Sequence, residues 1–200
     1  MRVSVRAISE LDDVLERHGV DLSSAEVIEE LDAALTSVAS VGAAPLSRAE
    51  VAFLRANAGP HAAEVLDGWD PAVERRHRAR ATVARVAQAA AASMSIAEAA
   101  LLLGVDRSRI SHRLSQGTLW AFTMGRTRRI PRWQFSADGG LLPGLASVVA
   151  AIPEGITPQT IEAFMRAPLP DLDGDAPVDY LAAGGNPRPV ADFVAALGEW

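Results

Sequence analysis

Apolar residues recur at helical spacing through the first part of the chain, which predicts helices there. The Ser-Arg-Ala-Glu sequence at residues 47–50 is a capping box, and Pro71 suits the first turn of a long helix that continues to Ala92. The recurring apolar positions include Ile8, Leu11, Val14, Leu15, Ile28, Leu31, Leu35 and Val38. We therefore expect residues 1–92 to form a helical bundle or dimerisation region.

Residues 93–135 have the pattern of two short helices joined by a tight turn. A second capping box, Ser95 to Glu98, starts one helix at Ile96. Gly104 permits the positive φ of a sharp turn, and Asp106 is placed to cap the next helix. This second helix is expected to extend from Arg107 to Gln116, and the pair would form a helix-turn-helix.

The two faces of the second helix differ in chemistry. At 100° per residue, Ile110 and Leu114 point together into the core. The outward positions are small, polar or cationic, and none is acidic: Ser108, His112 and Ser115 point away, Arg109, Ser111 and Gln116 flank them, and Arg107 and Arg113 lie nearer the core edges. A helix that enters the DNA major groove needs such a surface.

A predicted β-hairpin follows the second helix. Residues 119–123 alternate like a strand, residues 124–127 form a turn, and residues 128–131 return. The turn and return strand carry Arg126, Arg128, Arg129 and Arg132. Such a wing can contact the DNA backbone or the minor groove. Trp120, Trp133 and Phe135 could stack on bases, but we expect them in the core because a small winged domain needs large apolar side chains to close.

The stretch SIAEAALLLGVDRSRISHRLSQGTLWAFTMGRTRRIPRWQF resembles the excisionase and MerR-type winged helix-turn-helix family over about a fifth of the chain. In that family the second helix enters the major groove and the hairpin touches the backbone. The resemblance implies DNA-contacting roles for Arg107, Ser108, Arg109, His112, Arg113, Arg126, Arg128 and Arg129.

Charge is distributed unevenly along the chain. The net charge is −6, and all 19 basic residues are arginine. Residues 75–92 and 93–135 each carry a net charge of +5, whereas residues 1–74 carry −9 and residues 136–200 carry −7. A basic middle segment between acidic flanks fits a local site for a polyanion, or arginines that pair with those flanks. The run from Arg75 to Arg80 is interpreted as a solvated or ion-paired helix face, with contact to DNA phosphates as the alternative.

The last third of the chain has the pattern of a small helical module. Helices are expected over residues 145–152 and 158–166, from Pro177 to a stop at Gly184, and from Pro189 onward. The module carries many carboxylates, which could cover the basic mouth of a partner's active site or merely cap helices and solubilise the surface.

This segment resembles the toxin-binding domain of the Xre/MbcA/ParS antitoxins. The residues that carry the resemblance are Leu172, Asp173, Gly174, Pro177, Leu181, Gly185, Pro187 and Val190. It implies a protein toxin as partner, with a NAD-consuming RES-domain toxin favoured and a PIN-domain nuclease as the alternative, because the winged unit here departs from many members of that family. The toxin-binding residues implied are Leu172, Asp173, Pro177, Tyr180, Leu181, Gly185, Phe193 and Trp200.

Several other chemistries lack the residues they need. The chain has no cysteine, and its four histidines are far apart, so we expect no metal site or cofactor. Asp171, Asp173 and Asp175 imitate the start of a calcium loop, but Ala176 and Ala182 stand where that loop needs Gly and Glu. No nucleotide-binding or nucleophile motif is present, which argues against an enzyme.

The start of the sequence lacks a secretory pattern, and no apolar stretch suits a membrane span, so a cytoplasmic location is expected.

These patterns together predict a mainly α protein with three parts: an N-terminal helical bundle at residues 1–92, a winged helix-turn-helix at 93–135 and a toxin-binding module at 136–200. The expected function is that of a homodimeric antitoxin that binds duplex DNA, represses its own operon and neutralises a toxin. The alternatives are a stand-alone transcriptional regulator and an excisionase-like architectural protein, neither of which has a toxin partner.

Overall fold

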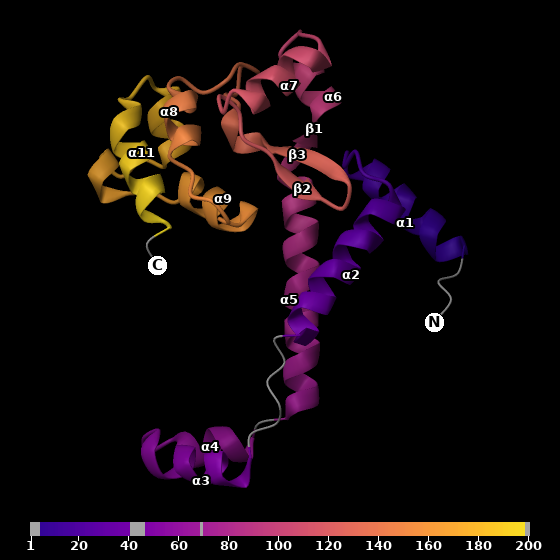
Figure 1. The fold of residues 1–200 in the computed structure, drawn as a ribbon, viewed down its shortest axis with the longest axis vertical. Coiled ribbons are helices and arrows are strands. Elements are labelled where there is room, and N and C mark those ends of the chain that lie inside the picture. The colour runs from indigo at the N-terminus through magenta and orange to yellow at the C-terminus, as the bar shows by residue number, and fades with distance from the viewer. Residues whose placement is uncertain (1–4, 41–46, 69, 199–200) are drawn as a thin grey trace. The chain divides into compact units, whose positions relative to one another are not determined.

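The computed structural model describes residues 5–40, 47–68 and 70–198, and its fold is mainly helical with one small β-sheet (Figure 1). Its contacts divide the chain into two compact units. One consists of Met1–Val27 together with Ala87–Trp200, and the other consists of Ile28–Val86. These boundaries differ from the predicted ones after residues 92 and 135.

All the regular elements in the described part of residues 28–86 are helices. It contains most of α2 (Ser24–Ser40), α3 (Arg48–Asn57), α4 (Ala62–Asp67) and most of α5 (Pro71–Ala91). The predicted capping box starts α3, because the Ser47 hydroxyl accepts a hydrogen bond from the Glu50 amide and the Glu50 carboxylate accepts one from the Ser47 amide. An ion pair between Arg55 and Asp67 joins α3 to α4.

The larger unit begins with α1 (Val5–Arg17) and contains a three-stranded antiparallel sheet. Strand β3 (Thr127–Pro131) lies between β1 (Ser93–Ser95) and β2 (Phe122–Met124). The hairpin of β2 and β3 was predicted, whereas β1 was not, because three residues are too few for an alternating pattern. The sheet brings the end of α5 beside the return strand of the hairpin, where Met94 lies opposite Ile130.

Helices lie between the first two strands in the sequence and again after the third strand. Between β1 and β2 lie α6 (Ile96–Leu102) and α7 (Arg107–Ser115), and a 3₁₀ turn at Arg132–Gln134 follows β3. The C-terminal part contains α8 (Leu145–Ala150), α9 (Pro158–Arg166), a 3₁₀ turn at Pro170–Leu172, α10 (Pro177–Ala182) and α11 (Pro187–Ala196). Helix α11 packs on α8, as Figure 1 shows, and α10 packs on α9.

The last helix starts two residues earlier than predicted. Pro187 occupies its first turn, where the missing N–H of proline costs no hydrogen bond. The Asn186 side chain caps the helix by accepting a hydrogen bond from the Arg188 amide at 3.1 Å. The asparagine and the first proline together mark the start of the helix better than Pro189 does.

One hydrophobic core extends across the predicted boundary at residue 135. Ile110 and Trp133 belong to the same buried cluster as Val148 and Ile161, and all four are at most 2% exposed. Leu172, Leu181, Val190 and Val194 of the C-terminal segment also belong to it. Residues 136–198 are therefore packed as part of the unit that holds the helix-turn-helix, and removing the chain from residue 168 onward would open that unit's core.

No helix in the described ranges combines the length and the apolar composition that a membrane crossing requires.

Candidate nucleic-acid interface

The helix-turn-helix forms as its sequence predicts. At the start of α6, the Ser95 hydroxyl accepts a hydrogen bond from the Glu98 amide at 3.1 Å, and the Glu98 carboxylate accepts one from the Ser95 amide at 2.7 Å. Gly104 then adopts a φ of 63°, a backbone conformation that residues with a Cβ atom rarely adopt. Asp106 occupies the N-cap position of α7, although its side chain makes no capping hydrogen bond.

The orientation of α7 confirms the predicted facing. Ile110 is fully buried and Leu114 is 8% exposed, so this side of the helix packs into the core. Every other residue of the helix is exposed: Arg107, Ser108, Arg109, Ser111, His112, Arg113 and Ser115. The outward surface is therefore polar and cationic along its whole length.

No carboxylate in the described part of the chain neutralises the arginines of this surface. Within the described residues, no ion pair or hydrogen bond engages the side chains of Arg107, Arg109 or Arg113. Arg128 on β3 is also exposed and without such a partner, whereas Arg132 lies 3.7 Å from the Glu98 carboxylate. Four guanidinium groups thus remain available for an anionic ligand.

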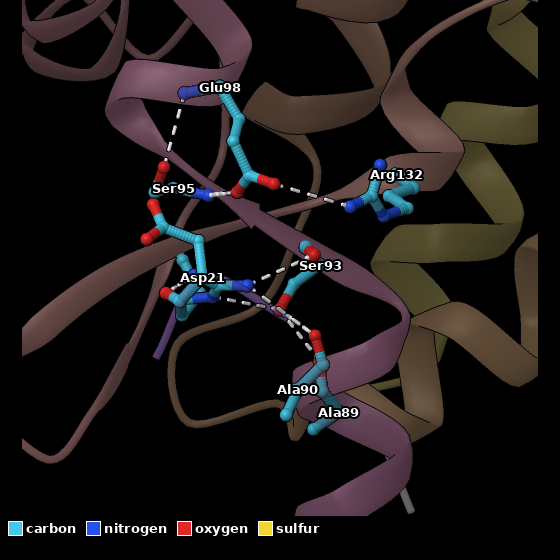
Figure 2. Close-up of polar contacts among 8 residues, drawn as sticks. Asp21, Ala89, Ala90, Ser93, Ser95, Glu98 and Arg132 are labelled. Carbon is cyan, nitrogen blue, oxygen red and sulfur yellow. Dashed lines mark hydrogen bonds and ion pairs between the residues drawn. The ribbon is translucent and has the colours of Figure 1, made fainter. Parts of the chain in front are cut away.

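Arg129 corrects the predicted set of DNA contacts, because it is fully buried. Its guanidinium donates to the Asp21 carbonyl at 2.7 Å, the Ser93 carbonyl at 3.1 Å and the Ser93 hydroxyl at 3.2 Å. A longer contact of 3.5 Å reaches the carbonyl of Ala90 near the end of α5. Figure 2 shows Asp21, Ala90 and Ser93 together, beside the separate pairing of Glu98 with Ser95 and Arg132. Arg129 is therefore a structural residue.

Electrostatics at Arg129 fit this structural role. Burial lowers the pKa of the guanidinium from its usual value, and the negative charges of Glu98 and Asp21 oppose that effect. An arginine stays protonated even so, and its donors satisfy carbonyl groups from two separate stretches of the chain, at Asp21 and at residues 90–93.

The tip of the β2–β3 hairpin contacts the protein itself, unlike a wing that is free to contact DNA. The Thr127 hydroxyl donates to the carboxylate of Glu26 near the start of α2. At Gly125, where φ is 57°, an added Cβ would lie 3.2 Å from the Glu26 carbonyl oxygen. Hydrogen bonds from Thr127 and from the Ser23 amide lower the pKa of Glu26 below its usual value. This tip packs against the protein and is not placed to insert into a minor groove, although Arg126 there is exposed.

The three aromatic side chains considered for base stacking belong to the core. Trp133 is 2% exposed, and Trp120 and Phe135 are partly buried against the same cluster. Sequence reasoning favoured this interpretation over stacking on bases.

The predicted toxin-binding residues fall into two groups. Leu172 and Leu181 are at most 1% exposed and Pro177 is buried, so these three cannot touch a partner in this conformation and instead shape the segment. Asp173 is exposed and adopts a left-handed φ of 58° before Gly174. The remaining described members, Tyr180, Gly185 and Phe193, are partly exposed. Trp200 lies outside the described residues.

Comparisons with known proteins do not assign the chain to a family. No protein-family profile matches the chain, and no curated protein matches it. Among solved structures, the chain is similar to the NMR structure of Rv2175c, at 25% sequence identity and with a TM-score of 0.41. The similarity covers 52% of this chain and 80% of that one.

Proposed function

We propose that this protein binds duplex DNA, with α7 as the helix that enters the major groove. The observation that carries the proposal is the exposed cationic surface of α7, whose opposite side is fixed in the core by Ile110 and Leu114. A helix held in this way presents donors to base edges and guanidinium groups to phosphates, with no acid on its outward surface.

Each exposed residue has a role that follows from its place on the helix. Arg109 and His112 lie on the outward side and are assigned to base edges, with Ser108 beside them. Arg107 and Arg113 lie nearer the core edges and are assigned to phosphates on either side, as is Arg128 on the hairpin. Arg126 is kept as a backbone contact, and Arg129 is removed from the set because it is buried.

Replacing Arg128 by alanine is expected to weaken binding to all duplex sequences about equally. One phosphate contact is lost, so the slope of log affinity against log salt concentration should become shallower by about one unit. Fluorescence anisotropy with a short random-sequence duplex over a series of salt concentrations measures both quantities.

The matched control for this change is Arg48→Ala, which removes the same charge from an exposed position on α3 in the other unit. It should leave the slope unchanged. An unaltered slope for Arg128→Ala would remove the hairpin from the interface, and absence of salt-dependent binding by the wild-type chain would overturn the proposal itself.

The proposal includes a homodimer that binds a repeated site and represses its own operon. Support comes from apolar side chains left exposed in the unit at residues 28–86, where Phe53 is 65% and Val65 is 66% exposed. A contiguous apolar patch is typical of a surface that is covered in an assembly, and the proposal assigns these side chains to such a patch.

A second candidate function is capture of a protein toxin by the C-terminal segment, as its resemblance implies. The observation that favours it is the row of exposed carboxylates around the Asp173 turn, formed by Asp171, Asp173, Asp175 and Asp179. Such a surface complements a cationic active-site mouth. A RES-domain toxin is favoured as the partner, and a PIN-domain nuclease is the alternative.

Co-expression with the product of the adjacent gene tests this candidate. The wild-type chain should co-purify with that product, and Asp171→Arg with Asp175→Arg should weaken the complex. Glu154→Arg reverses one exposed charge elsewhere and should leave the complex intact. If the wild-type chain captures nothing, the stand-alone regulator or the architectural protein becomes the better description.

A further inference from the structure

An open cleft with a volume of about 680 Å³ lies along one side of α7. Its first wall is formed by α7 and the turn that follows: Arg109, His112, Arg113, Gln116 and Thr118. Its second wall comes from the C-terminal segment, far along the chain: Leu141, Leu142, Gly144, Leu145 and Ala146. Residues 141–146, which are distant in sequence from α7, therefore face the side of the candidate recognition helix that carries Arg109, His112 and Arg113.

The two walls differ in chemistry. The α7 wall carries two guanidinium groups and an imidazole, all exposed, and neither arginine has an acidic partner among the described residues. The second wall is apolar with small residues, since Gly144 and the exposed Ala146 lie there. None of the described residues that line the cleft is acidic, so none of them repels a phosphate.

The geometry of a duplex gives the cleft a specific occupant. A major groove is about 12 Å wide, so a helix within it has a sugar-phosphate strand on each side. Any element of the protein beside α7 must either contact one of these strands or prevent the helix from entering. Here that element is separated from α7 by a cleft, and the cleft has cations on one wall and an apolar, uncharged surface on the other.

We infer that this cleft holds one sugar-phosphate strand of the bound duplex, an inference that rests on the proposed DNA-binding function. Arg113 contacts the phosphates from the α7 side, and residues 141–146 contact the deoxyribose rings from the other. The C-terminal segment is thus part of the DNA interface as well as part of the core.

Two neighbouring positions on α8 allow a matched test. Ala146 lines the cleft, whereas Ser147, the next residue, is also exposed and does not line it. Ala146→Glu would place a carboxylate against the strand and should weaken binding to a random-sequence duplex by about tenfold. Ser147→Glu changes the net charge by the same amount and should stay within about twofold of wild type.

The opposite substitutions separate a strand in the cleft from a general effect of charge. Ala146→Arg should add a phosphate contact and steepen the salt slope by about one unit, and Ser147→Arg should not. Circular dichroism of each variant checks that the fold is retained at these exposed positions. Equal effects at the two positions would overturn the inference while leaving DNA binding in place.

A competition experiment distinguishes a duplex strand from a free phosphate ion as the ligand of the cleft. Inorganic phosphate at the same ionic strength as a chloride control should not displace the duplex, because a single phosphate cannot span both walls. Displacement by phosphate alone would show a free-anion site and overturn the inference. Failure of the wild-type chain to bind any duplex would instead overturn the proposed function.

Discussion

Replacing Arg129 by alanine is expected to lower the free energy of unfolding by about 3 kcal/mol. The guanidinium is fully buried, and its loss would leave the carbonyl groups of Asp21 and Ser93 without their donor. A buried acceptor that loses a charged partner keeps its desolvation cost, and the vacated volume adds a cavity. Urea denaturation followed by circular dichroism measures this change.

The neighbouring residue supplies the control for this prediction. Arg128→Ala removes the same side chain from an exposed position on the same strand, so the free energy of unfolding should change by less than about 0.5 kcal/mol. The two variants are therefore expected to separate stability from binding: Arg129→Ala should unfold more easily, and Arg128→Ala should bind DNA more weakly. Equal stabilities of the two variants would contradict the buried position of Arg129.

Replacing Arg109 by alanine is expected to have the largest effect on sequence selectivity. If this guanidinium contacts a base edge, its removal costs about 1–3 kcal/mol on the preferred site, which is roughly a 5- to 150-fold loss of affinity. The loss should be smaller on random duplexes, because only base contacts distinguish sequences. Selection of a preferred site from a random pool, followed by anisotropy on that site and on a scrambled duplex, gives both affinities.

Arg107→Ala is the matched comparison on the same helix. Arg107 lies near the core edge and is assigned to phosphates, so its loss should weaken binding to both duplexes by the same factor. A pattern in which Arg109→Ala and Arg107→Ala reduce both affinities equally would exclude base recognition by Arg109 and would reduce α7 to a backbone-binding element.

Local structure around the candidate site could be predicted from the sequence because it depends on local rules. The capping box at Ser95 and Glu98 and the inward placement of Ile110 and Leu114 follow from helix geometry alone. The burial of Arg129 also had a signal in the sequence. Consecutive residues of a strand point to opposite faces, so Arg128 and Arg129 could not both face a ligand.

Contacts between distant segments had no comparable signal. Nothing in the sequence near Glu26 indicates that its carboxylate accepts a hydrogen bond from Thr127, and nothing near Leu141 indicates a wall beside α7. The continuous core across residue 135 was missed for the same reason, and the three glycines and one proline between residues 136 and 144 are themselves typical of a loop. Such pairings depend on the packing of the whole unit, which local periodicity does not encode.

The larger unit is discontinuous in sequence, because residues up to Val27 join those from Ala87 onward and the unit at residues 28–86 is inserted between them. Folding of the larger unit must therefore close a long loop, and that closure carries an entropic cost. This entropic cost would be smaller if self-association or a bound ligand held residues 28 and 86, the two ends of the inserted unit, near the distance they have in the folded protein. Assembly through residues 28–86 would then raise the thermal stability of the larger unit without touching it.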